Sequence, residues 1–92
     1  MTSEQAKQIR MLIGNYRYDE RCVKRTELVD MMRSIYVTSP KTGKPIRPES
    51  YVGYREGKML KNLSKYDMIW YLNHFLENEK IQPESSRGFF AA

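Results

Sequence analysis

The sequence holds a single histidine, His74, and a single cysteine, Cys22, the side chains that most often serve nucleophilic or general-base chemistry. Together they allow at most one nucleophile–base pair, and no feature of the sequence predicts that they meet. Asp67 precedes His74 by seven residues, so both lie on a similar face of a predicted helix, where the carboxylate can orient the imidazole. No nucleophile accompanies this pair, and we interpret His74 as a partly exposed structural histidine.

Metal and phosphate sites find little support in the sequence. A zinc site takes about four ligands at a recognisable spacing, and one histidine with one cysteine falls short of that number. Gly43-Lys44 does not complete a phosphate-binding loop, because Thr38 stands five residues before Gly43 where glycine is required, and Pro45 follows the lysine. We therefore expect no cofactor and no metal.

One pair of carboxylates is loosely similar to part of a nuclease site. Pro48-Glu49 followed by Glu56-Gly57-Lys58 is loosely similar to the motif of metal-dependent nucleases, in which two carboxylates hold Mg²⁺ and a lysine assists the attacking water. The spacing is short, the motif is loose, and a chain of 92 residues is small for such a site. The sequence therefore predicts a binding protein that is not an enzyme.

The positive charge is concentrated in one segment of the chain. The net charge is +5, and residues 41–65 hold seven basic against two acidic residues, whereas residues 1–40 hold seven against five. Residues 66–92 are acidic, with two basic and four acidic residues. The candidate binding residues are the seven cations of this segment and two interleaved tyrosines: Lys41, Lys44, Arg47, Tyr51, Tyr54, Arg55, Lys58, Lys61 and Lys65.

This composition leaves two classes of partner open. Basic side chains neutralise phosphates and aromatic rings stack on bases, which indicates nucleic acid. The alternative is a protein–protein interaction or inhibitory module that engages an acidic partner protein, because Tyr, Trp, Met and Arg are enriched at protein interfaces. A structural subunit, a small-anion site and an enzyme without a recognisable motif are weaker alternatives.

The expected location follows from what the sequence lacks. One cysteine allows no intramolecular disulfide, and the first residues do not form a basic segment followed by an apolar one. The longest apolar run, residues 68–72, is far shorter than the roughly 20 residues of a membrane span. We expect a cytoplasmic protein, or a nuclear one in a eukaryote, that does not bind membranes.

Three segments carry apolar residues at helical spacing, and we predict helices over residues 3–16, 26–36 and 64–79. Their stripes must converge on one core if so small a domain is to be stable. Tyr36 is expected to extend the inward stripe of the second helix, and Trp70 to widen that of the third. The predicted N-cap residues are Ser3, Thr26 and Ser64. The predicted core consists of Leu12, Ile13, Met32, Ile35, Met68, Leu72 and Phe75.

Between the second and third helices lies a segment with weaker signals. Residues 38–50 contain three of the four prolines and are predicted to form a loop, and residues 51–60 are predicted to form a short β-hairpin. The predicted fold is mainly α with a small β part: a three-helix core with a short β-hairpin or an irregular basic insert between helices 2 and 3. A winged-helix-like arrangement is the alternative. Residues 1–80 are expected to form one compact domain, and residues 81–92 a flexible C-terminal tail.

Overall fold

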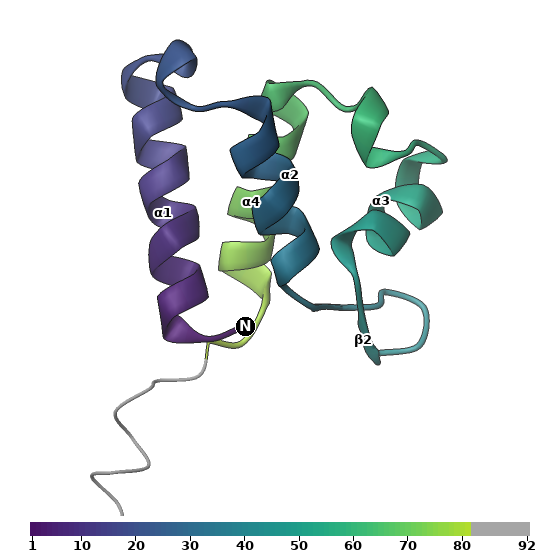
Figure 1. Cartoon of the computed structure of the whole chain (residues 1–92). Coiled ribbons are helices and arrows are strands. Elements are labelled where there is room, and N and C mark those ends of the chain that lie inside the picture. Colours follow the sequence, from purple (N-terminus) through teal and green to yellow (C-terminus); the bar gives the residue numbers. More distant parts are fainter. Residues whose placement is uncertain (82–92) are drawn as a thin grey trace, which may run out of the picture.

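The computed structural model describes residues 1–81 and is mainly helical with a small β ladder, as the sequence predicted (Figure 1). The three predicted helices are present with small changes at their ends. In chain order the elements are α1 (Ser3–Tyr18), the 3₁₀ turn η1 (Glu20–Cys22), α2 (Arg25–Ser34), β1 (Val37–Thr38), β2 (Pro45–Ile46), α3 (Pro48–Glu56), the 3₁₀ turn η2 (Leu60–Asn62) and α4 (Lys65–Asn78).

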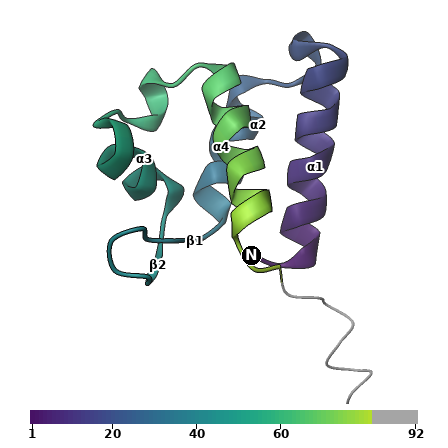
Figure 2. The same ribbon diagram turned by 180° about the vertical axis from the view of Figure 1, so that it is seen from behind.

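Helices α1, α2 and α4 surround the main core. Helix α4 contacts both α1 and α2, and α3 packs against α2 on the side of the molecule away from α1 (Figures 1 and 2). Helices α1 and α2 run in opposite directions, as the colours of Figure 1 show. The largest fully buried side chains are apolar and come from every helix and from β1: Ile9, Val23, Leu28, Met32, Ile35, Val37, Pro48, Val52, Leu63, Met68, Leu72 and Phe75.

The predicted core residues are buried with one exception. Leu12 is only partly buried and lies at the margin of the core. Two predictions about large side chains were wrong: Tyr36 is 52% exposed and Trp70 is 43% exposed. Helix α2 ends at Ser34, so the chain is already extended at Tyr36, and the side chain leaves the helical stripe that the sequence had assigned to it.

The N-cap residue of α4 was predicted correctly, and the N-cap residues of α1 and α2 were not. Ser64 Oγ accepts a hydrogen bond of 3.1 Å from the Asp67 amide, so the hydroxyl satisfies one of the free amides of the first turn. Helix α1 is capped by Thr2 instead of Ser3. Helix α2 begins at Arg25 after Lys24, so Thr26 lies within its first turn.

The insert between α2 and α4 differs most from the prediction, because residues 51–56 are helical and the strands lie earlier. Pro48 occupies the first turn of α3, where its fixed φ suits a helix and its missing amide costs nothing. The helix buries Tyr51 and Val52 and ends at Gly57, whose φ of +67° favours glycine. The antiparallel ladder pairs Val37 with Ile46 and Thr38 with Pro45. The predicted β-hairpin at residues 51–60 is therefore wrong.

Two further predictions concern topology and the chain end. The winged-helix alternative required its second and third helices to form a helix-turn-helix, but α2 and α4 are separated by β1, β2, α3 and η2. The predicted flexible tail, residues 81–92, lies outside the described residues except for Ile81.

We expect Ser64→Ala to lower the free energy of unfolding by about 1 kcal/mol, because the Asp67 amide loses its acceptor. Chemical denaturation measures the change. Ser50→Ala is the matched control, because the Ser50 side chain is exposed and makes no hydrogen bond within residues 1–81. An equal effect of both substitutions would show that the cap does not stabilise α4.

Candidate binding surface

Four lysines of the predicted basic segment lie on the side of the molecule away from α1. Lys41 and Lys44 belong to the connection between β1 and β2, and Lys58 and Lys61 to the chain that joins α3 to α4 (Figures 1 and 2). All four are exposed. Within residues 1–81, none of the four ammonium groups makes a hydrogen bond or an ion pair. We call these four residues the lysine face.

Two other predicted cations hold the fold together. The Arg47 guanidinium donates to the Arg33 carbonyl at 2.9 Å and lies 4.0 Å from the centre of the Tyr36 ring. The Lys65 ammonium donates to backbone carbonyls in the connection between α1 and α2, at 2.8 Å and 3.0 Å. Donor groups held by carbonyls are less available to a partner, so we place Arg47 and Lys65 outside the lysine face.

Sequence reasoning missed Arg25, which positions part of the lysine face. Its guanidinium donates to the carbonyl of Leu60 at 3.0 Å, to that of Lys61 at 2.7 Å, and to that of Leu63. A planar guanidinium can bind several acceptors at once, so one side chain fixes η2 against the start of α2. No local pattern marks Arg25 for this role, because its three acceptors come from residues 35 to 38 positions away.

The two predicted tyrosines have different environments. Tyr51 is only 8% exposed, its ring packs edge-on against Phe75 at 5.1 Å, and its hydroxyl lies 3.1 Å from His74 Nε2. The Tyr51 ring therefore cannot stack on a base unless the core opens. Tyr54 lies on the outer side of the same helix and is 58% exposed.

A second group of aromatic rings lies where α3 meets α4. The guanidinium carbon of Arg55 is 5.2 Å from the Trp70 ring centre, and Trp70 stacks parallel to His74 with 5.3 Å between the centroids. Tyr66 is 66% exposed and lines the same hollow as Arg55 and Trp70. Sequence reasoning missed Trp70 and Tyr66 as surface rings, because Trp70 was assigned to the apolar face of its helix.

The two carboxylates of the nuclease-like motif face different partners. Glu49 forms a salt bridge with Arg33 of α2 at 3.3 Å, whereas Glu56 accepts a hydrogen bond from the Tyr71 hydroxyl of α4. Burial, followed by the contact with Glu56, raises the pKa of Tyr71 far above its usual value. Residues 1–81 contain no group of three or more His, Cys, Asp and Glu side chains that could hold a metal ion.

The environment of His74 corresponds to the structural interpretation of this residue. Its ring nitrogens lie within hydrogen-bonding distance of the Tyr51 hydroxyl and of Asn78 Nδ2 at 3.3 Å, and the side chain is partly exposed. Asp67 is not among these hydrogen-bond partners. Cys22 is exposed in η1, in the connection between α1 and α2.

The comparisons with known proteins found no matching family, no similar curated protein and no similar solved structure. In the described part of the chain, no helix combines the length and the apolar composition that a membrane crossing needs.

We expect Tyr71→Phe to weaken the pH dependence of stability in alkali. The neutral Tyr71 hydroxyl donates to Glu56, so the raised pKa stabilises the folded state below pH 10, and this contribution is lost as the pH rises further. Above that pH the wild type should lose up to about 1.4 kcal/mol more per pH unit than the variant. Denaturation at several alkaline pH values measures the difference, and parallel pH profiles would contradict it.

Proposed function

We propose that this protein is a non-enzymatic nucleic-acid-binding module that contacts the polymer through its lysine face. The observation that carries the proposal is that four ammonium groups are exposed and unpaired within residues 1–81. They belong to Lys41, Lys44, Lys58 and Lys61. The four groups lie on two connections at opposite ends of α3, on the side of the fold away from α1. Such groups can neutralise phosphates and release counterions without breaking an internal contact.

The charge around the lysine face supports the same proposal. Residues 41–65 carry only two acidic residues, Glu49 and Glu56, and both already have partners in Arg33 and Tyr71. The segment therefore keeps a net positive charge, which attracts a polyanion over distances of about 10 Å at moderate salt.

An exposed aromatic ring near the lysine face favours single-stranded polymers. Tyr54 lies on α3, just before the connection that carries Lys58 and Lys61, and is 58% exposed. Aromatic rings stack on bases that are unpaired, and each such contact contributes about 1–3 kcal/mol. We therefore propose that single-stranded DNA or RNA binds more tightly than duplex DNA.

The proposal predicts that a variant with Lys41, Lys44, Lys58 and Lys61 all replaced by Glu loses binding. Fluorescence anisotropy with labelled single-stranded DNA, RNA and duplex DNA measures the affinity at several salt concentrations. For single strands, the logarithm of the wild-type affinity should fall with the logarithm of the salt concentration, with a slope of about −0.7 per contacted phosphate.

A second variant distinguishes binding at the lysine face from non-specific binding caused by the net positive charge. Replacing Lys7, Arg10, Arg17 and Arg21 by Glu changes the net charge equally, but these exposed residues lie on α1 and in η1, away from the lysine face. This control should keep most of the affinity. Equal losses in both variants, equal affinity for all polymers, or no binding at low salt would refute the proposal.

The second candidate function is binding to an acidic protein, and the exposed Met59 favours it. Met59 lies beside Lys58 in the connection to α4 and is 62% exposed, and Tyr54 is 58% exposed. An apolar side chain among cations is typical of a protein interface with a charged rim. This methionine would add little affinity for nucleic acid, because nucleic acid contacts mainly cationic side chains and aromatic rings.

Met59→Ser distinguishes the two functions. We expect it to leave the affinity for nucleic acid within about twofold, because phosphate and stacking contacts do not use the methionine. The anisotropy measurement described above provides the comparison. If wild type binds no nucleic acid, and an acidic protein recovered from the native source loses affinity through Met59→Ser, the second candidate function replaces the first.

A further inference from the structure

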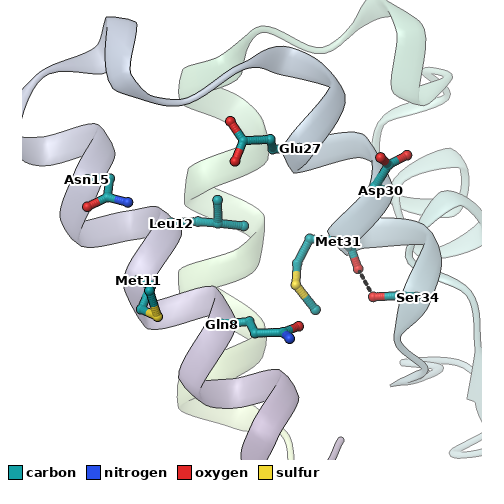
Figure 3. Close-up of a pocket in the computed structure, with 8 residues that line it drawn as sticks. All are labelled: Gln8, Met11, Leu12, Asn15, Glu27, Asp30, Met31 and Ser34. Carbon is teal, nitrogen blue, oxygen red and sulfur yellow. Dashed lines mark hydrogen bonds between the residues drawn. The ribbon is translucent and has the colours of Figure 1, made fainter.

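A groove of about 480 Å³ runs between α1 and α2 (Figure 3). Asp30 of the groove also lines a neighbouring hollow together with Arg33 and Lys61. The residues that line the groove recur at intervals of three and four on both helices, so each helix contributes one continuous face. These residues are Gln8, Met11, Leu12 and Asn15 of α1 and Glu27, Asp30, Met31 and Ser34 of α2.

The groove has an apolar centre. Leu12 and Met31 point into the space between the two helices in Figure 3. Met11 lies at the edge of the groove on α1 and is 59% exposed. Methionine side chains are flexible and polarisable, so they can adapt to the side chains of an incoming segment.

The charge of the groove is opposite to that of the protein as a whole. Its lining contains two carboxylates, Glu27 and Asp30, and no basic side chain, although the whole chain has a net charge of +5. One Glu27 oxygen accepts a hydrogen bond from the Lys24 amide at 2.9 Å. Asp30 is exposed and has no hydrogen-bond or ion-pair partner within residues 1–81. The two carboxylates would attract a cationic group, and Asp30 also lines the neighbouring hollow that contains Arg25, Arg33 and Lys61.

We propose that this groove binds a cationic amphipathic helix of a partner protein. The lining residues span eight residues on each helix, from 8 to 15 and from 27 to 34, which is a length of about 10 Å or two helical turns. An amphipathic helix offers apolar side chains at the matching spacing of three and four residues. Its apolar stripe would contact Met11, Leu12 and Met31, while flanking lysines or arginines would meet Asp30 and Glu27.

A second copy of this chain fits the groove less well. Each described α-helix already buries apolar residues in its own core, so residues 1–81 offer no spare amphipathic helix. The free lysines of the lysine face lie outside the described α-helices. The chemistry of the groove therefore favours a different protein. This second surface is independent of the proposed nucleic-acid binding.

The test uses a labelled synthetic peptide of about fourteen residues, with leucines spaced for one helical face and lysines on both sides of it. A second peptide carries glutamate in place of every lysine. The positive protein attracts the acidic peptide non-specifically, so tighter binding of the cationic peptide in fluorescence anisotropy would report the groove. No binding of the cationic peptide, or tighter binding of the acidic one, would overturn the proposal.

Two groove variants locate the binding. Asp30→Lys should lower the affinity for the cationic peptide by about tenfold, and Met11→Gln should lower it by about threefold. Both residues are exposed, so these substitutions do not disturb the core. The matched controls are Glu77→Lys on α4 and Met59→Gln beside the lysine face, which make the same chemical changes at other exposed sites. Both control variants should bind the cationic peptide with an affinity within about twofold of that of the wild type.

Two further outcomes would decide against the proposal. Equal weakening by the groove variants and their controls would show that the peptide binds elsewhere. Self-association of the wild type in sedimentation that Met11→Gln abolishes would assign the groove to a second copy of the chain. Nucleic-acid binding should be unchanged in Met11→Gln, so failure of the groove and failure of the lysine face are measured separately.

Discussion

The apolar face of α4 has to be covered, and the rest of the fold follows from how it is covered. Met68, Leu72 and Phe75 are almost fully buried although α4 lies near the surface in Figure 2, because α1 and α2 pack against it and Tyr51 of α3 packs on Phe75. Burial of such side chains contributes about 1.5–3 kcal/mol each. A chain of this size has no second core to compensate for their exposure.

The packing around α4 divides the basic residues by their chemistry. Arg25 at the start of α2 binds backbone carbonyls of η2, and Arg47 binds the Arg33 carbonyl near the end of α2. Arg55 lies against Trp70. The planar guanidinium suits these roles because it offers several donors and a flat face. The lysines of the lysine face remain in solvent, as suits a strongly hydrated ammonium group. Cations that hold the fold and cations available to a partner are thus largely different residues.

The same arrangement leaves α2 between two surfaces of opposite charge. Met31 and Asp30 face the groove beside α1, while Arg33 points toward α3 and pairs with Glu49. Asp30 and Arg33 also line one hollow with Lys61, so the two surfaces adjoin along this ten-residue helix. The acidic lining of the groove favours a cationic partner and the lysine face a polyanion, so the two surfaces attract different partners.

The sequence by itself determined the features that depend on neighbouring residues. The three helical stripes, the Ser64 cap and the concentration of charge in residues 41–65 could all be predicted, because each arises from spacing or composition along the chain. The tertiary structure decided what depends on distant packing. Residues 51–56 form a helix that buries Tyr51 and Val52 in the core, against the strand preference of their types.

The availability of each candidate side chain was also decided by tertiary contacts. Arg47 and Lys65 look no different from Lys58 in the sequence, yet they bind carbonyls of distant segments. The groove between α1 and α2 is equally invisible from the chain, since each helix contributes only half of its lining. Periodicity shows that a face is apolar, but only the packing of the other elements determines whether that face is covered.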